Sequence, residues 1–415
     1  MLYQKINQCR ICGNKELEII IKLGNQALTG LFPLKNERVP KGPLTLARCV
    51  KTKKNNACGL VQLLHNYDLN VLYGDNYGYR SGLNKSMVNH LTYVVEDIKN
   101  KVKLKKGDLI IDIAANDGTL LKAYGKNGLT LVGIDPTIKK FKKFYPSHIE
   151  TISDFFSAKK TKFKYKQKAK VITSIAMFYD LEHPITFMEE VREVLAQDGL
   201  WVLEQSYMPR MLSNVSYDTI CHEHLEYYAL SQIKWMADKV GFKIVDVELN
   251  DINGASFRVT LAKKESLFKE NTRAINKILK NEEKIGIHRS SAYKKFEKSV
   301  KKHKKELRSF LNKLKKKKIK ILGYGASTKG NVILQFCGIT KKDIPFILDV
   351  NEYKYGRYTP ATKIPIISEE EGKSLKPEYL MVLPWHFKKN TIEREKEFLK
   401  KGGHLFFPLP ILEVI

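Results

Sequence analysis

From residue 109 onward, short β-rich runs alternate with helical stretches, and this alternation limits the fold more than any other feature of the sequence. Alternating strands and helices predict a parallel sheet with helices on both faces. The alternation occurs twice, with a strand-free stretch between the two series. The β-rich runs are 109–113, 131–134, 171–175, 200–204, 242–247 and 257–261 in the first series, and 319–322, 346–350, 379–383 and 405–407 in the second. We therefore expect an α/β chain with two Rossmann-like, doubly wound domains.

Helical periodicity marks the segments that precede and separate these two units. Residues 84–101 carry apolar side chains at helical spacing, and residues 270–318 carry an apolar stripe at three-four spacing. That stripe predicts one amphipathic helix face, on which His303 is a packing residue rather than a ligand. It consists of Tyr293, Phe296, Val300, His303, Leu307, Phe310 and Leu314.

Four of the six cysteines lie in the first 58 residues, which predicts a metal site. Cys9 and Cys12 form a C-x2-C knuckle, and Cys49 and Cys58 return after a loop. Four soft thiolates suit a tetrahedral, structural zinc ion. The second pair is more widely spaced than usual, so residues 51–56 must form a loop between the ligands. The alternative is four unrelated thiols that cluster by chance.

The charge of the chain is strongly positive, with 73 basic against 44 acidic residues among 415. Such an excess favours anionic partners through long-range attraction. Because lysines are scattered over every segment, we expect solvated surfaces rather than a nucleic-acid stripe. No apolar run approaches the ~18 residues of a membrane span, and residues 1–8 lack a secretion signal. We therefore expect a cytoplasmic protein that binds neither membrane nor nucleic acid.

The run 110–121 combines a β-rich strand, a turn of small residues and the start of a helix. Small side chains at Ala114, Asn116 and Gly118 leave room for a ligand over backbone N–H groups at a helix N-terminus. Asp135 ends the next strand, where a carboxylate accepts hydrogen bonds from ribose hydroxyls. The pattern predicts a cofactor that contains adenosine. A generic strand, turn and helix without a ligand is the alternative.

The charges around this turn indicate which cofactor it binds. Two of the three glycines of the dinucleotide fingerprint are missing, so the turn suits a pyrophosphate poorly. Asp112, at the strand end, suits the cationic amino-acid end of S-adenosylmethionine. Asp154, followed by Phe155 and Phe156, is placed in sequence to bind the adenine amine and stack on its ring.

A second motif follows the strand that ends near Glu204. The tripeptide His222-Glu223-His224 places two imidazoles beside a carboxylate, with tyrosines close by. This combination is typical of acid–base chemistry near neutral pH. The spacing differs from the H-E-x-x-H zinc helix, and no third ligand follows closely.

Together these motifs resemble the sugar C-methyltransferases that act on nucleotide-linked keto-deoxysugars. Members of that family have an N-terminal zinc segment, a central S-adenosylmethionine domain and a C-terminal Rossmann-like domain. The resemblance covers almost the whole chain. Its motifs are Cys9-Arg10-x-Cys12-Gly13, Cys58–Leu63, Tyr77–Ser81, Asp112–Leu121, Glu204-Gln205-x-Tyr207, Tyr217–Ile220 with His222–His224, and Gly323–Asn331.

The resemblance implies roles for individual residues. It makes His224 the general base, with Glu223, His222 and either Tyr79 or Tyr77 around the substrate. Family members carry a tyrosine immediately before His-Glu-His, where this sequence has Cys221. A thiol is a poorer hydrogen-bond donor, so the substrate and the face attacked stay open.

A third motif, residues 323–331, joins a strand to a helix in the second α/β unit. Ser327 and Lys329 sit where backbone N–H groups face an anion, which suits a sugar-nucleotide diphosphate. The resemblance makes Trp385 a candidate for the same substrate, with a core position as its alternative. The resemblance adds further candidates for substrate binding, namely Arg80, Tyr207, Asn253, Arg258 and Asn331.

We therefore expect an S-adenosylmethionine-dependent C-methyltransferase that methylates a carbon next to the keto group of a nucleotide-linked deoxysugar. General-base deprotonation to an enolate is the expected mechanism. The alternatives are an RNA methyltransferase and a non-catalytic zinc-containing interaction protein. The expected domains are 1–66 (zinc-binding), 67–105 (helical connector), 106–265 (methyltransferase), 266–318 (helical linker) and 319–415 (nucleotide-sugar-binding).

Overall fold

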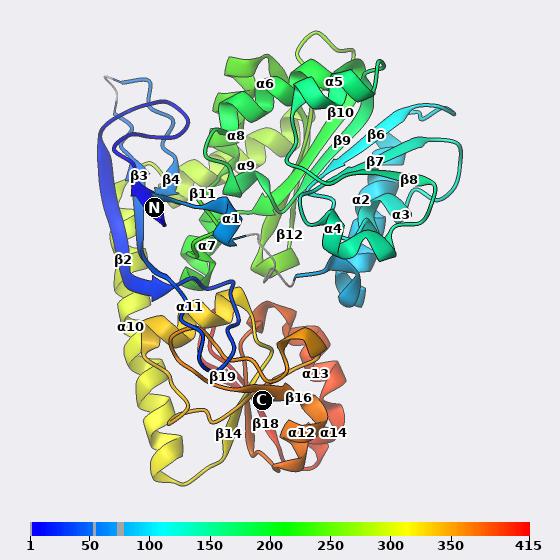
Figure 1. The fold of residues 1–415 in the computed structure, drawn as a ribbon. Helices are drawn as coiled ribbons and strands as arrows, with labels where there is room; N and C mark the ends of the chain where they lie inside the picture. The colour runs from blue at the N-terminus through cyan, green and yellow to red at the C-terminus, as the bar shows by residue number, and fades with distance from the viewer. Residues whose placement is uncertain (1, 53–54, 73–78) are drawn as a thin grey trace.

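The computed structural model describes residues 2–52, 55–72 and 79–415. Three sheets and a long helix organise them (Figure 1). The central sheet carries helices on both faces, the C-terminal unit lies below it, and the N-terminal strands and α10 (Ser290–Lys316) lie at one side of both. The remaining helices are α1 (Leu69–Leu72), α2 (Lys85–Lys101), α3 (Thr119–Lys122), α4 (Ile138–Phe141), α5 (Ala158–Lys164), α6 (Pro184–Val194), α7 (Met208–Ser213), α8 (Leu230–Val240), α9 (Thr272–Ile285), α11 (Thr328–Cys337), α12 (Glu369–Ser374), α13 (Lys388–Arg394) and α14 (Lys396–Lys400).

The N-terminal sheet is antiparallel, with the order β11-β4-β3-β2. Its first three strands along the chain are β2 (Leu17–Ala27), β3 (Lys41–Cys49) and β4 (Val61–Leu63). The fourth, β11 (Glu226–Tyr227), comes from the central unit and directly follows the His222–His224 tripeptide. The candidate catalytic segment is thereby joined to the cysteine-containing unit. A two-stranded ribbon, β1 (Tyr3–Lys5) with β5 (His65–Tyr67), completes this part.

The central sheet has seven strands in the order β12-β13-β10-β9-β6-β7-β8. In β6, alternate side chains enter two different hydrophobic clusters, with Ile111 in one and Ile110 in the other. Both faces of the sheet are therefore covered, as the uninterrupted apolar run predicts. The strands are β6 (Leu109–Ile113), β7 (Thr130–Ile134), β8 (Ile149–Ile152), β9 (Ala169–Ile175), β10 (Leu195–Ser206), β12 (Phe242–Asn250) and β13 (Ser256–Lys263).

Two details of this sheet differ from the sequence-based expectation. β13 runs antiparallel to both β10 and β12, so the sheet is not entirely parallel. The loop between β12 and β13 is too short for the crossover that a parallel pair requires. β8 is also a strand that the β-rich runs did not predict.

The C-terminal sheet has the order β16-β15-β14-β17-β18-β19, with only β19 antiparallel among its pairings. This is a Rossmann-like arrangement, as predicted. The two edge strands, β16 and β19, were not predicted from the sequence. The strands are β14 (Ile321–Tyr324), β15 (Ile347–Asp349), β16 (Ile366–Ser368), β17 (Tyr379–Val382), β18 (His404–Phe407) and β19 (Glu413–Val414).

The predicted helical segment 270–318 is two helices rather than one. α9 ends at Gly286, which has φ 77° and caps the helix in the left-handed conformation. The predicted stripe then lies on α10, where its members are buried except Phe310, which is partly buried. His303 is a packing residue, with Nε2 donating to Pro408 O at 2.6 Å. Residues 84–101 form α2 as predicted, with Asn84 as the N-cap.

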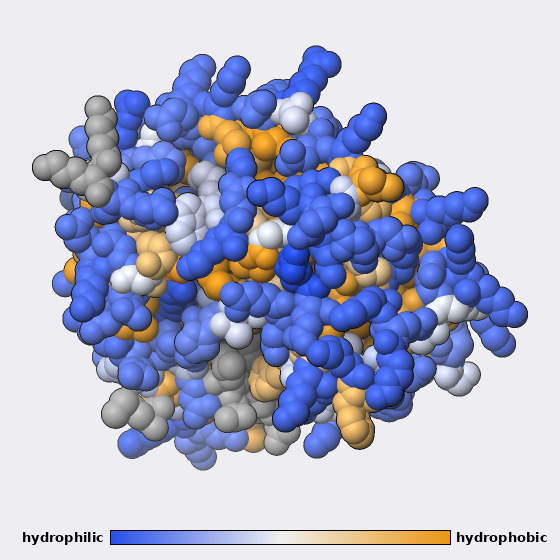
Figure 2. Space-filling view, turned by 90° about the horizontal axis from the view of Figure 1, so that it is seen from above, coloured by the Kyte–Doolittle hydropathy of each residue, from blue (hydrophilic) through white to orange (hydrophobic). Residues whose placement is uncertain are grey.

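Hydrophilic side chains cover most of the face shown in Figure 2, with hydrophobic residues between them. Most lysines of α10 lie on its exposed side. The positive charge is thus carried largely by exposed side chains. Within the described residues, none of the helices is both long enough and apolar enough to cross a membrane.

Candidate active site and zinc centre

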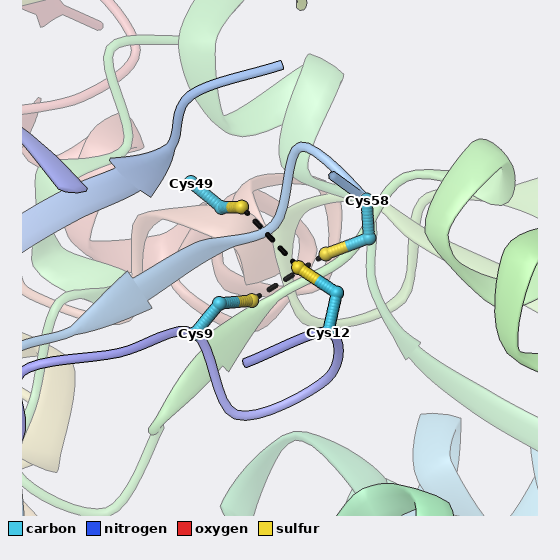
Figure 3. Close-up of side chains that lie close together, drawn as sticks. All are labelled: Cys9, Cys12, Cys49 and Cys58. Carbon is cyan, nitrogen blue, oxygen red and sulfur yellow. Dashed lines mark hydrogen bonds between the residues drawn. The ribbon is translucent and has the colours of Figure 1, made fainter. Parts of the chain in front are cut away.

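The four N-terminal cysteines converge on one point. Their Sγ atoms all lie within 4.8 Å of one another, with Cys9 and Cys58 at 3.4 Å and Cys12 and Cys49 at 3.5 Å (Figure 3). A tetrahedral zinc ion with Zn–S bonds of about 2.3 Å places its sulfurs roughly 3.8 Å apart. The cluster therefore fits zinc. In the predicted loop 51–56, Asn55 Oδ1 accepts from Thr52 N, and positions 53–54 are outside the described residues.

The turn after β6 has the strained backbone that a close-approaching ligand requires. Ala114, Asn116 and Gly118 all have positive φ, at 61°, 51° and 73°. Asp135, at the end of β7, accepts from Asn116 N at 2.9 Å and so ties the two strand ends together. A Cβ at Gly118 would come within 2.7 Å of the Tyr145 ring. The conformation of the turn is thus restrained by Asp135 on one side and by Tyr145 on the other.

Asp112 lies beneath this turn and is buried. Thr173 Oγ1 on β9 donates to its Oδ1 at 2.6 Å. Burial raises the pKa of Asp112 to about 7, and the neighbouring Asp135 adds to that rise. A cationic ligand group next to Asp112 would lower this pKa again, because it favours the charged carboxylate.

A loop before α2 packs on the same turn. Asn116 Oδ1 accepts from Ser81 N at 3.0 Å, and its Nδ2 donates to Tyr79 O at 3.1 Å. Asp117 Oδ2 accepts from Gly82 N at 3.0 Å. Among the candidates, the Arg80 guanidinium stacks 4.0 Å from the Phe144 ring centroid. The Tyr79 side chain is half exposed, and Tyr77 lies outside the described residues.

The candidates for the adenine end lie at the surface beyond β8. Asp154 is paired with Lys160 and accepts from Phe155 N at 2.8 Å. Phe155 is 49% exposed, whereas Phe156 packs edge-on against Phe187 at 5.4 Å. Of this group, Phe155 is the ring available for stacking.

His222 is buried against the N-terminal unit. Its Nδ1 accepts from Thr29 N at 3.4 Å, and its Nε2 donates to Gly42 O at 3.4 Å. The Tyr67 ring packs edge-on against it at 4.8 Å. Burial lowers the pKa of His222 to about 4, so the ring is neutral and both nitrogens are engaged.

Glu223 and His224 point into the region between the three units. Glu223 lies beside Thr29 and Gly30, where a Cβ on Gly30 would come within 2.2 Å of its Oε1. Burial raises the pKa of Glu223. His224 Nδ1 donates to Thr219 O at 2.9 Å, and its ring packs 4.3 Å from Tyr179. Among the described residues Nε2 has no hydrogen-bond partner, and with the proton on Nδ1 it carries the lone pair of the neutral ring.

A cation from the C-terminal unit faces this histidine. Lys329, in the first turn of α11, donates to Asn253 O at 2.7 Å. Burial lowers the pKa of His224 to about 3, and the charge of Lys329 lowers it further in the same direction. Trp385 Nε1 donates to the buried Asp218 Oδ2 at 2.7 Å. The site thus combines His224 with Lys329, Asn253 and Trp385, from segments up to 161 residues apart in sequence.

The remaining substrate candidates lie away from this group or are already engaged. Ser327 Oγ caps α11 by accepting from Gly330 N, and Asn331 donates to Thr29 O at 2.8 Å. Tyr207 OH donates to Glu282 at 2.9 Å in the core. Arg258 pairs with Asp97 and Glu248 beneath α2.

The sequence interpretation missed three residues of this region. Asp218 is fully buried, and its Oδ1 has no partner among the described residues. The charge of Asp218 raises the pKa of Lys329, whereas the burial of Lys329 lowers that pKa. Tyr179 holds the His224 ring, and Thr29 links His222 and Glu223 to the N-terminal unit. A buried Asp within the Tyr217–Ile220 motif was the available signal. Cys221 is buried beside them, and burial raises the pKa of its thiol.

Three family profiles match consecutive segments of the chain. They describe a zinc binding domain over residues 9–73, a methyltransferase domain over 87–247 and a C-methyltransferase C-terminal domain over 251–410. The C-methyltransferase NovU of Streptomyces niveus is 28% identical, over 100% of this chain and 98% of its own length. Together, the three profiles and this relative identify an S-adenosylmethionine-dependent C-methyltransferase.

This C-methyltransferase uses S-adenosylmethionine as methyl donor and has a zinc site at its cysteine cluster, both as predicted. The non-catalytic alternative is therefore wrong. Solved structures match a smaller part of this chain than NovU does. The PH0226 protein of Pyrococcus horikoshii is 17% identical over 44% of this chain and 94% of its own, with a TM-score of 0.34. The plantazolicin methyltransferase BpumL, solved with SAH, is 16% identical over 42% of this chain and 83% of its own, with a TM-score of 0.33. Scores this low add nothing to the fold assignment, which rests on the strand order.

Proposed function

We propose that this enzyme methylates the carbon next to the keto group of a nucleotide-linked deoxysugar, with His224 as general base. The observation that supports the proposal is the state of the His224 ring. Because Thr219 O can only accept, Nδ1 must carry the proton and Nε2 must present its lone pair. A base of this kind is required to remove a proton from carbon, whereas methyl transfer to an oxygen or nitrogen acceptor makes a smaller demand on the base.

The charges around His224 suit an enolate. In the proposed step, Nε2 takes the proton from the carbon next to the ketone, and the electron pair moves to the carbonyl oxygen. Lys329, the cation that acts on His224, stabilises the oxyanion. The low pKa keeps His224 neutral before the substrate reacts. Negative charge on the oxygen then offsets Lys329, so the pKa of His224 rises as the proton arrives.

The methyl donor, when bound, supplies an electrophilic methyl group to the carbanion. Its site and His224 belong to the same edge of the central sheet. β6 and β9 are neighbouring parallel strands, and the turn after β6 carries Asp112–Gly118. The segment after β9 carries Tyr179, which packs on His224. The carboxyl ends of such strands form the crevice where α/β domains bind their ligands.

We assign the nucleotide part of the substrate to the C-terminal unit. The turn after β14 leads directly into α11, so backbone N–H groups at the N-terminus of this helix favour an anion. Lys329 adds a positive charge in the first turn of that helix. A diphosphate carries the charge that both features recognise.

The test is incubation with labelled S-adenosylmethionine and a panel of nucleotide-linked ketosugars, with the new methyl group located by NMR. We expect transfer to a carbon next to the ketone and none to the corresponding alcohols, which cannot form an enolate. An RNA panel in the same assay tests the alternative. Methylation of RNA with steep salt dependence would refute the proposal.

A further inference from the structure

We infer that Arg10, which lies between two zinc ligands, positions the catalytic His224. This inference rests on the proposed role of His224 as the base. Arg10 follows Cys9 in the C-x2-C knuckle, and its side chain is only 3% exposed. Its contacts join it to β4, to β5 and to the segment that carries His224.

The guanidinium of Arg10 holds this segment through several acceptors. Its Nη1 donates to Leu63 O at 2.7 Å and to Leu225 O at 3.3 Å. Its Nε lies 3.7 Å from Glu226 Oε1, in an ion pair whose carboxylate side chain is fully buried. Leu225 and Glu226 directly follow His224, so the contact is made within two residues of the base.

The backbone of Leu225 is fixed from two further directions. Its N–H donates to Tyr179 O at 2.8 Å, and its carbonyl accepts from Leu63 N at 2.8 Å. Tyr179 is the residue whose ring packs on His224. Leu225 therefore shares one network with the knuckle and with the wall of the His224 site.

A second branch reaches the central unit. Arg10 Nε donates to Asn66 Oδ1 at 3.1 Å, and Asn66 Nδ2 donates to Glu182 Oε2 at 2.7 Å. A planar guanidinium with five donors can hold all these acceptors at once, whereas a lysine ammonium cannot. Arg10 is thus a positioning residue. It connects the zinc knuckle to the segment that carries His224 and so restrains the position of that ring.

The Arg10→Lys variant tests this inference, because it keeps the charge opposite Glu226 but loses the planar fork. We expect kcat to fall by about 10- to 100-fold, since small displacements of a base are costly. The KM for S-adenosylmethionine and the zinc content should stay at wild-type values. Solvent deuterium uptake at the carbon next to the ketone, measured with S-adenosylhomocysteine bound, should fall by the same factor.

The matched control is Arg48→Lys. Arg48 is also a buried arginine of the same unit, with a side chain 7% exposed, but it donates to Glu18, to His288 O and to Ser290, and joins β3 to the start of α10. We expect this variant to keep wild-type turnover and exchange. A second variant, Arg10→Met with Glu226→Gln, removes both charges and should show the same loss as Arg10→Lys.

Three results would overturn the inference. One is exchange in Arg10→Lys equal to that in Arg48→Lys, and another is loss of zinc in proportion to activity. The third is wild-type exchange in the double variant, which would leave only charge neutralisation as the role of Arg10. His224→Gln, measured alongside, separates the two proposals. If that variant still exchanges deuterium at the wild-type rate, the proposed base is wrong, and the inferred role of Arg10 is then refuted as well.

Discussion

Acid should loosen the segment that carries His222 and His224. The perturbation is a change from pH 7.5 to pH 5 on the zinc-loaded enzyme. Burial lowers the pKa of His222 to about 4 and that of His224 to about 3, both from 6.5. Because both values are lowered on folding, the open form binds protons first as the pH falls. The stability from both rings is therefore complete above pH 6.5 and is lost toward pH 4 to 3.

The magnitude follows from these values. At pH 5 an exposed ring is protonated, because the pH lies about 1.5 units below its pKa, whereas the buried ring stays neutral. This difference favours the open form by about 2 kcal/mol for each ring. Two rings give about 4 kcal/mol in favour of the open form, but Glu223 and Glu226 act in the opposite direction, because burial raises their pKa and proton uptake then stabilises the closed form. Removing one ring isolates its own share, which is about 2 kcal/mol or roughly thirtyfold in the opening equilibrium.

Hydrogen exchange followed by mass spectrometry measures this opening directly. Protection factors for peptides spanning 219–228, corrected for the intrinsic rate, are compared at the two pH values in the wild type and in a His222→Asn variant, which keeps both glutamates. The ratio of protection at pH 7.5 to protection at pH 5 should be about thirtyfold larger in the wild type, because only the wild type carries the buried His222 ring. The same ratio in both proteins would refute the reasoning, because it would mean that the buried His222 ring does not resist protonation.

His224→Gln should lower kcat by about 10²- to 10⁴-fold and leave the dissociation constant for S-adenosylmethionine unchanged, as checked by calorimetry; parallel loss of both would indicate a structural role. Chelation of zinc should loosen the β4–β11 pairing and lower activity, and a thermal shift unchanged by chelator would contradict this. Gly118→Ala should weaken S-adenosylmethionine binding and cost at least about 1 kcal/mol of stability, because φ is 73° there and a Cβ meets Tyr145; wild-type affinity and melting temperature would contradict it. Trp385→Phe removes the donor to the buried Asp218, so we expect about 1–3 kcal/mol less stability by chemical denaturation, whereas an unchanged midpoint would place that hydrogen bond outside the folded core.

Periodicity and spacing predicted the elements that depend on local chemistry. The apolar run of β6 and the stripe of α10 are visible in the sequence because burial selects side chains at the repeat of the backbone. The break at Gly286 was missed, although a glycine between two periodic stretches was a possible signal. The antiparallel β13 was also missed, and the short loop before it was the available indication.

The order of motifs along the chain was enough to indicate the three units, the four thiolates and the small-residue turn after β6, since each depends on residues close together in sequence or on a simple count of ligands. The assembly of the catalytic region was not accessible in that way. Thr29, His224 and Lys329 come from three separate units, and their distances depend on how those units pack. Packing also fixed the His224 ring, because the carbonyl of Thr219 faces Nδ1, and it placed Arg10 of the zinc knuckle beside β11, the strand that follows His224.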